Sequence, residues 1–412
     1  MSTIANEWQD LPFSEAVLVN PTTSLERGKV YPFVEMSAIT AGTRDVKCSE
    51  QREFSGGGSK FRDRDTLMAR ITPCLENGKI ARFQAPESQP VGHGSTEFIV
   101  IRGRPDVSDN DFAYYLTISP EVRHFAISQM TGSSGRQRVP TDAFDAISIP
   151  LPPLDEQKAI AAVLGALDDK IELNRRMNVT LEAMAQTLFK NWFVDAAAEQ
   201  LPAGWREATF GEHLEVAKGL SYKGSGLADA GVPLHNLNSV YEGGRYKHEG
   251  LKHYTGEYAE RHIVHPGDVI VANTEQGHDY LLIGFPAIVP KCYGKFGLFT
   301  HHIYRVRPLA GSSLTNHFIY LALLTPAIRN QVIGHTNGTT VNALSKTGIE
   351  AAVFPLPPAE LIAKFEKIVA PIFDQQELLH EESKKLSRLR DTLLPKLLIG
   401  ELSVAALTRQ PD

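Results

Sequence analysis

Apolar residues recur at helical spacing in two stretches of the chain, one on each side of its midpoint. They alternate by three and four from Leu164 to Trp192 and again from Val369 to Leu397. This 3.5-residue period predicts two long helices, each with a narrow apolar seam suited to pairing with another helix. Polar residues interrupt the seam at four places, where we expect them to fix the register at some cost in stability. They are Asn174, Asn178, Gln376 and Ser383.

The two helical stretches repeat one another. Both open on Pro-Leu-Pro-Pro, and the offset is 205 residues at each end (153 to 358, 187 to 392). Nothing has been inserted or deleted inside either copy, which argues against two unrelated core helices. Equal helices that each follow a long globular segment pack most simply as an antiparallel pair. Pro371 removes a backbone donor, so we expect it to kink or divide the second helix near Ala370, with a bend near Gly165 in the first.

The segments before the helices also match each other. Asp65–Ala69 matches Asp268–Ala272, and Arg102–Pro105 matches Arg305–Pro308. Each segment shows short strand-like runs and one main helix that stops before a proline. The predicted strands are Thr66–Ile71, Glu97–Ile101, Val269–Ala272 and Ile303–Val306, and the predicted helices are Asp111–Ser119 and Asn316–Leu324. Both segments should share one fold with different loops.

These patterns predict an α+β protein with a pseudo-twofold internal repeat. Two similar mixed α/β domains are separated by two long antiparallel helices that form a coiled coil. The predicted order is a globular domain at 1–150, a helical region at 151–198, a second globular domain at 199–355 and a second helical region at 356–412. A chain of 412 residues has room for this arrangement.

Composition and charge are those of an ordinary globular protein. The formal net charge is −6 and no domain is strongly basic, so nucleic-acid binding would need local clustering of cations. No apolar run approaches the ~18 residues of a membrane span, and the N-terminus lacks a secretory signal pattern. The three cysteines lie far apart, which suits a reducing compartment and argues against a cysteine-rich zinc site. We therefore expect a cytoplasmic protein.

Motifs for the common nucleotide-dependent reactions are missing. Asn77–Ile80 lacks the first glycine and the hydroxyl of a phosphate loop, and Asn20–Thr23 lacks the aromatic with which an adenine methyltransferase stacks its flipped base. Glu156–Lys158 has nuclease-like spacing but no matching acidic strand. Of the 14 histidines most lie in 201–355, where a metal site, ordinary hydrogen-bonding histidines and polar contacts to DNA all stay open. No residue is assigned to catalysis or to a metal.

Short polar and basic residues gather around glycines in several loops. Gly56–Arg62 puts donors on a flexible backbone beside an aromatic, and Thr131–Arg138 is similar, with a counterpart at Gly338–Thr340. Asn273–His278 takes the place of Arg70–Pro73 in the second segment. Amides, hydroxyls and guanidinium groups hold phosphate, and Arg, Asn and Gln also read base edges. Solvated loops without a ligand are the alternative for each cluster.

Several motifs resemble the specificity subunit of type I restriction–modification systems, over nearly the whole chain. They are the doubled Pro-Leu-Pro-Pro starts, Leu154–Ile160, Leu167–Ile171 and the ending Leu393–Leu402. Ala69–Lys79 with Gly94–Phe98 resembles one type of target-recognition domain, and Pro266–Asn273 with His301–Pro308 resembles another.

The resemblance implies a non-catalytic reader of double-stranded DNA. Each globular domain would read one half of a bipartite, asymmetric target, while the helices set the spacer and dock two modification subunits. Those subunits would methylate adenine with S-adenosylmethionine, and restriction subunits would add an ATP- and Mg-dependent nuclease, so this chain would bind no cofactor itself. Two departures are Ala359–Leu361 in place of Leu154–Gln157, and Pro371, which has no proline counterpart in the first copy.

The candidate contacts fall into two sets. DNA contacts are expected from Lys60, Arg62, Arg70, Lys79, Ser133, Ser134, Arg136 and Arg138 in the first domain and from Lys218, Lys223, Asn273, Gln276, His278, Thr339 and Thr340 in the second. Partner-subunit contacts are expected from Gln157, Ile160, Leu164, Phe189, Trp192, Phe193, Phe365, Leu394 and Leu398 on the helices. The competing interpretation is a coiled-coil adaptor whose globular ends bind protein. Clustering of Lys60, Arg62, Arg136 and Arg138 on one face would favour DNA, and dispersal would favour the adaptor.

Overall fold

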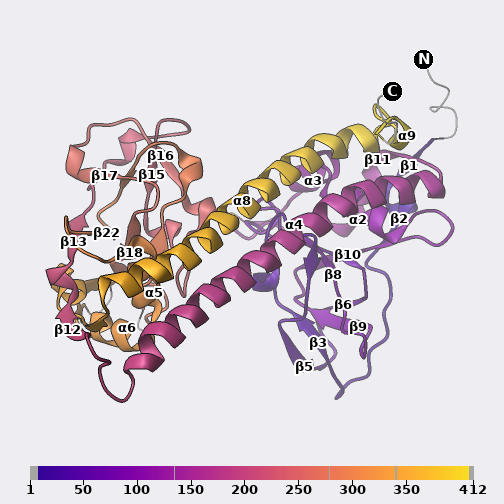
Figure 1. Cartoon of the computed structure of the whole chain (residues 1–412). Coiled ribbons are helices and arrows are strands. Elements are labelled where there is room, and N and C mark those ends of the chain that lie inside the picture. The colour runs from indigo at the N-terminus through magenta and orange to yellow at the C-terminus, as the bar shows by residue number, and fades with distance from the viewer. Residues whose placement is uncertain (1–7, 134, 278, 339–340, 408–412) are drawn as a thin grey trace. The chain divides into compact units, whose positions relative to one another are not determined.

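The chain forms two compact units (Figure 1). The structure is a computed structural model that describes residues 8–133, 135–277, 279–338 and 341–407. The first unit takes the chain up to Asn174 and from Glu382 onward, and the second takes Arg175–Glu381. Each unit therefore combines one globular segment with part of both long helices, whereas the predicted segments follow the chain in order.

The two long helices are α4 (Leu154–Phe189, 36 residues) and α8 (Ala359–Leu398, 40 residues). In the first unit they run antiparallel, since Asn174 donates to Glu382 at 2.7 Å and Asp168 pairs with Arg390 at 2.6 Å. The later residue of α4 thus meets the earlier residue of α8.

The same antiparallel pairing holds the helices together in the second unit. The side-chain amide of Gln376 donates to the Asn178 carbonyl at 3.1 Å and to the Glu182 carboxylate at 3.2 Å. The Phe189 and Phe365 rings lie 5.8 Å apart. The polar seam residues therefore lie between the helices as predicted.

Helix α8 continues through Pro371 without interruption, and α4 continues through Gly165. Of the kink or division predicted near Ala370, the division is therefore wrong, and the kink stays a prediction, as does the bend near Gly165. A proline removes one backbone hydrogen bond, and packing along the rest of a 40-residue helix outweighs that loss.

In the first unit a five-stranded sheet has the order β2-β10-β7-β8-β4. Its strands are Val17–Val19, Phe98–Gly103, Thr66–Ala69, Ile80–Phe83 and Asp45–Val46. A four-stranded sheet has the order β5-β3-β9-β6, with strands Glu50–Glu53, Val30–Val34, Val91–Gly94 and Ser59–Arg62. Strands β1 (Gln9–Pro12) and β11 (Ser148–Leu151) pair, and β11 leads into α4. A short helix α1 (Phe13–Ala16) follows β1, and another, α9 (Val404–Leu407), follows α8.

The second unit repeats this plan. One sheet has the order β13-β22-β18-β20, with strands Leu214–Lys218, Ile303–Pro308, Val269–Ala272 and Pro286–Ile288. Another has the order β14-β16-β15-β21-β17, with strands Leu227–Ala228, Lys252–Tyr254, Val232–His235, Gly297–Phe299 and Ile263–Val264. A small sheet joins β19 (Thr274–Gln276), β24 (Val341–Leu344) and β23 (Thr336–Asn337), and β12 (Arg206–Thr209) pairs with β25 (Val353–Leu356) before α8.

The helix predicted in each globular segment is present, as α2 (Asn110–Ile118) and α5 (Asn316–Leu324). The prolines that end them also begin a second helix each, α3 (Pro120–Ser128) and α6 (Pro326–Ile333). Proline suits the first helical position because its missing N–H has no partner there anyway. Each segment therefore has two helices at this point, with a further short one, α7 (Lys346–Glu350), in the second unit.

Strand register fixes which residues correspond between the units. Thr66 pairs with Ile101 in the first unit, as Val269 pairs with Val306 in the second. Arg102 therefore corresponds to Arg307, two residues beyond the Arg305 that the sequence match suggests. Both form buried or half-buried ion pairs with the equivalent aspartates, Arg102 with Asp65 at 2.6 Å and Arg307 with Asp268.

Each unit has its own apolar core, built from its sheets, its short helices and the inner faces of α4 and α8. None of the helices in the described part of the chain is both long and apolar enough to cross a membrane.

Candidate nucleic-acid interface

A cleft of about 360 Å³ opens at one side of the five-stranded sheet in the first unit. Its walls come from the loop after β2, from β10, from the start of β6 and from the residue that follows β7. Lys60 and Arg70, both predicted to contact DNA, line this cleft. Among the described lining residues there is no aspartate or glutamate.

Backbone geometry shapes the cleft. Asn20 turns the chain after β2 with a φ of +49°, a conformation that Asn tolerates better than most residues, and its side-chain oxygen accepts the Val100 N–H at 2.9 Å. Gly58 has a φ of +84°, and a side chain there would collide with the Gly94 carbonyl. The glycine-rich loop thus approaches β9 closely because no side chain intervenes.

The two cations of the cleft are held by contacts other than ion pairs. The Lys60 ammonium lies 5.3 Å from the centroid of the Phe54 ring. Arg70 donates from Nη2 to the Val139 carbonyl at 2.8 Å, and its buried Nε has no hydrogen-bond partner among the described residues. Within the described part of the chain neither cation forms an ion pair with a carboxylate.

Arg138 lies beside the cleft and is held by Glu97. Its Nε and Nη2 donate to the Glu97 carboxylate at 2.9 and 2.6 Å. These hydrogen bonds, with the charge of Arg138, lower the pKa of Glu97. A bridge between Arg138 and Ile71 places the loop next to Arg70.

The remaining candidates of the first unit vary in position. Ser133 and Arg136 are exposed in the loop that carries Arg138. Arg62 is exposed at the end of β6, and the Lys79 ammonium donates to the Met36 carbonyl at 2.8 Å, so neither belongs to the cleft. Ser134 lies outside the described residues.

The equivalent face of the second unit carries different side chains. Asn273 takes the place of Arg70, since its N–H donates to the His302 carbonyl at 3.1 Å as that of Arg70 donates to the Glu97 carbonyl at 2.9 Å. Asn273 is only 4% exposed, and its side chain donates to the His301 carbonyl at 3.0 Å. The Asn273 side chain is thus buried and supports the backbone of this face, and its contact with DNA stays a prediction.

Histidines occupy the position held by Thr96 and Glu97 in the first unit. The His301 and His302 rings lie 3.9 Å apart, and His302 Nδ1 is 3.1 Å from the Thr274 hydroxyl. Partial burial, with the nearby His301 and Lys218, lowers the pKa of His302. Sequence reasoning left these two histidines among several open roles, because nothing local distinguishes them from the others.

Of the other candidates in the second unit, Lys218 is exposed at the end of β13 and Gln276 at the end of β19. Lys223 is exposed in the loop before β14. His278, Thr339 and Thr340 lie outside the described residues. No group of three or more His, Cys, Asp or Glu in the described part of the chain is arranged to hold a metal.

The residues predicted to contact partner subunits are mostly inside the protein. Trp192 is half-buried, and the other eight are at most 5% exposed: Gln157, Ile160, Leu164, Phe189, Phe193, Phe365, Leu394 and Leu398. The Gln157 side chain, for example, accepts the Asp109 N–H at 2.8 Å and donates to the Val107 carbonyl at 2.9 Å. The chain thus covers its own apolar seams at these eight positions, and their contact with partner subunits stays a prediction.

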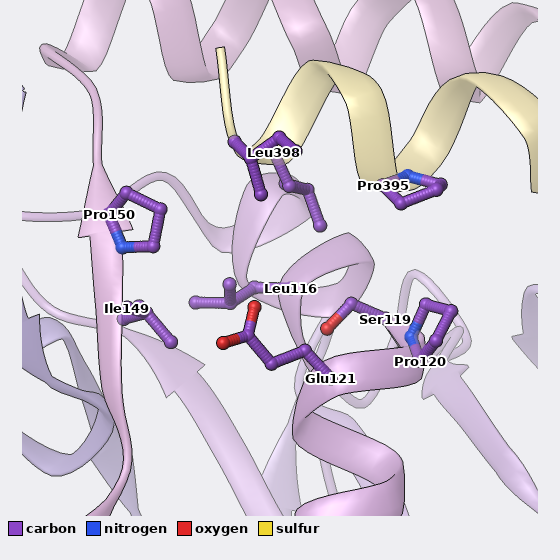
Figure 2. Close-up of a pocket in the computed structure, with 9 residues that line it drawn as sticks. Leu116, Ser119, Pro120, Glu121, Ile149, Pro150, Pro395 and Leu398 are labelled. Carbon is purple, nitrogen blue, oxygen red and sulfur yellow. The ribbon is translucent and has the colours of Figure 1, made fainter. Parts of the chain in front are cut away.

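A small hollow of about 180 Å³ lies where the end of α8 meets the globular part of the first unit. Figure 2 shows Pro395 and Leu398 of α8 facing Leu116, with Ile149 and Pro150 of β11 on another side. Ile399, at the rim, is 53% exposed. This is an apolar gap in the packing of the unit.

Comparison with known proteins gives one consistent result. Residues 23–183 match the family described as the type I restriction modification DNA specificity domain. The chain is 26% identical to the MjaIX specificity subunit of Methanocaldococcus jannaschii over 72% of this chain and 70% of that one. It is also 26% identical to the HindI specificity subunit of Haemophilus influenzae, over 75% of this chain and 81% of that one.

The fold agrees with a solved structure of the same kind. The S subunit of a type I restriction-modification system from M. genitalium aligns with a TM-score of 0.53 at 17% identity, covering 97% of this chain and 98% of that one. The duplicated α/β segments and the paired helices are thus the fold of that S subunit. The resemblance predicted from the sequence is confirmed: this chain is similar to the specificity subunits of type I restriction enzymes.

Proposed function

We propose that this chain is the DNA-recognition subunit of a type I restriction–modification complex, with no catalytic role of its own. Each unit reads one half of a bipartite, asymmetric target. The observation that carries the proposal is the duplicated fold, matched to specificity subunits, whose equivalent faces present different polar side chains. One backbone plan used twice with different chemistry suits a target whose halves differ in sequence.

One part of the distribution of cations supports DNA over the adaptor interpretation, although only Lys60 of the four cations named for this test lines the cleft. Lys60 and Arg70 share one cleft, and Arg138 adjoins it through the backbone of Ile71. Phosphate contacts need such local clustering when a chain is acidic overall, as this one is with its net charge of −6. Arg62 stands apart from the cleft, so the cluster is smaller than the sequence suggested.

The helices supply the second part of the proposal. They set the number of base pairs between the half-sites and dock two modification subunits, which methylate adenine with S-adenosylmethionine; ATP-dependent restriction subunits complete the nuclease. The continuous spans of α4 and α8 support a spacer role, because each helix contributes to both units. Because the eight inner residues are buried within this chain, docking is proposed for the other faces of the helices.

Single-molecule sequencing of methylated genomic DNA, from cells with and without this gene, tests the proposal. We expect one bipartite methylation motif that disappears with the gene. Inserting seven residues at matched places in α4 and α8 keeps the 3.5-residue period and should lengthen the spacer while leaving both half-sites unchanged. An altered half-site with the old spacing would contradict the spacer role.

A further inference from the structure

The cleft that holds Lys60 and Arg70 has a feature that general DNA recognition does not explain. The guanidinium Nε of Arg70 is buried without a hydrogen-bond partner among the described residues, and burying an unpaired donor costs free energy. The two cations also lie along one cleft without a carboxylate among the described residues that line it. Like charges in one place repel unless an anion joins them.

Neighbouring cations do not share this feature. Arg138 has its charge matched by Glu97 at 2.6 Å, and Arg102 has its charge matched by Asp65 at 2.6 Å. Lys60 and Arg70 differ from these two arginines because neither forms an ion pair with a carboxylate among the described residues, while the exposed Arg62 and Arg136 lie outside the cleft.

From this geometry we infer that the cleft is a seat for one phosphodiester of the DNA backbone. A phosphate oxygen would accept from the Lys60 ammonium and from Arg70, and the exposed Thr22 and Thr96, which also line the cleft, add hydroxyl donors. The inference rests on the proposed function and deepens it: this cleft positions the duplex and carries no sequence information.

The second unit lacks this pair of cations. Val264 pairs with Gly297 as Phe61 pairs with Gly92, so Ile263 takes the place of Lys60, and Asn273 takes the place of Arg70. The phosphate seat is therefore a property of the first unit.

A backbone scan of the DNA tests the inference directly. The full chain, assembled with its modification subunits, is titrated with duplexes in which one phosphate at a time is replaced by a neutral methylphosphonate. We expect one position beside the first half-site to weaken wild-type binding roughly tenfold, while the same substitution has no effect on K60A or R70A. Both variants should also reduce the slope of log K against log salt by about 1, equally for target and unrelated DNA.

Controls separate charge from folding. Lys60→Arg keeps the cation and should keep the wild-type slope. Lys47→Ala removes an exposed cation beside β4, at the opposite edge of the sheet from β2, and should leave the slope and the scan unchanged. Thermal unfolding of each variant identifies any loss that comes from misfolding, in which case Arg70→Lys replaces Arg70→Ala.

Three outcomes would overturn the inference. One is an unchanged scan and slope in K60A and R70A. Another is a loss confined to one target sequence, which would make the cleft a reader of bases. The third is a site for free phosphate only. Inorganic phosphate would then stabilise the wild type but not K60A, and the methylphosphonate scans of the wild type and K60A would be the same. Absence of any target preference in the wild-type complex would instead count against the proposed function.

Discussion

Arg70 follows strand β7 in the first unit, and Asn273 follows β18 at the same place in the second. Their backbones make the same two hydrogen bonds. The N–H donates to the carbonyl of Glu97 or His302, and the carbonyl accepts from the N–H of Val139 or Leu344. Around them the first unit places Glu97 and Arg138, and the second places His302 and Ala343. The backbone plan is thus held constant while the side chains that face outward change, which is how one fold serves two recognition tasks.

The anchoring of each globular segment to the helices differs as well. In the first unit Tyr115 donates to Asp168 at 2.7 Å, and Arg390 neutralises that carboxylate. In the second unit Tyr320 donates to Glu182 at 2.8 Å, whose other contacts are neutral amides. Both carboxylates come from α4, so the helical pair is not a symmetric repeat at its polar layers.

The largest expected effect comes from breaking the ion pair of the first unit. Arg390→Met leaves the buried Asp168 carboxylate without its cation and should cost about 3–5 kcal/mol. Gln376→Met in the second unit removes only a neutral donor from Glu182 and should cost about 1–2 kcal/mol. Hydrogen exchange in denaturant, resolved by peptide, reports the stability of each unit separately.

The double variant Arg390→Met with Asp168→Asn is the matched control for this prediction. It removes both charges and should recover most of the loss. Equal costs for Arg390→Met and Gln376→Met would remove the distinction between the two anchors.

The next effect concerns the outward face. Arg138→Ala gives the first unit the side chain that the second unit has at Ala343. If Arg138 reads a base, discrimination at one position of the first half-site should fall roughly tenfold to a hundredfold, with the second half-site unchanged. Methylation mapping measures this, and a uniform loss at both half-sites would show that Arg138 acts on folding or on phosphate.

Acid sensitivity should separate the units further. His235 is buried, with Nδ1 hydrogen-bonded to the Tyr246 hydroxyl at 2.7 Å, and burial lowers its pKa to about 3, whereas the equivalent residue of the first unit is Val34. The unfolded chain binds the proton near pH 6.5, so stability present at pH 7 is lost as the pH falls below that value. Between pH 7 and pH 5 the second unit should lose about 2 kcal/mol through this group.

His235→Asn keeps an acceptor for Tyr246 without the titration, and it should flatten the pH dependence of the second unit. Peptide-resolved hydrogen exchange at the two pH values makes the comparison. A slope that persists in the variant would assign the acid sensitivity to other groups.

The smallest effect concerns packing at the helix ends. By the repeat, Phe193 matches Leu398 (193 to 398), and the hollow of about 180 Å³ lies beside the leucine. Phe193→Leu should destabilise the second unit by about 1–2 kcal/mol, whereas Leu398→Phe should change the first unit by less than about 1 kcal/mol because the ring has room. Unfolding curves of the two variants check this, and a large loss in Leu398→Phe would mean that the hollow cannot take a ring.

The long helices were predictable from sequence because a sustained 3.5-residue apolar period fits neither a strand nor a loop. The same period does not distinguish a seam covered by another part of this chain from one covered by a partner subunit. Contacts with a partner subunit are therefore predicted for Leu164 and Leu394, although both lie in the apolar core of the first unit. The pattern records the need for burial and not the identity of the covering element.

Strand register and the roles of the outward-facing side chains were harder to predict from the sequence. Arg305 and Arg307 lie two residues apart on one strand and so point to the same side, which let a local motif match the wrong one to Arg102. The pairing of Arg138 with Glu97 joins residues 41 apart in sequence, and the burial of Asn273 depends on the His301 carbonyl. Such contacts follow from tertiary folding, so sequence alone identified the loops and not the roles within them.

The division of the chain into units has a consequence for biosynthesis. The second unit is one uninterrupted stretch of chain, whereas the first needs the segment that begins at Glu382 to supply Arg390, Leu394 and Leu397 to its interior. During translation the globular part of the first unit emerges before the residues from Glu382 onward, so its apolar seam stays uncovered until those residues have been made. The first unit can therefore close its core only after the whole second unit has been synthesised.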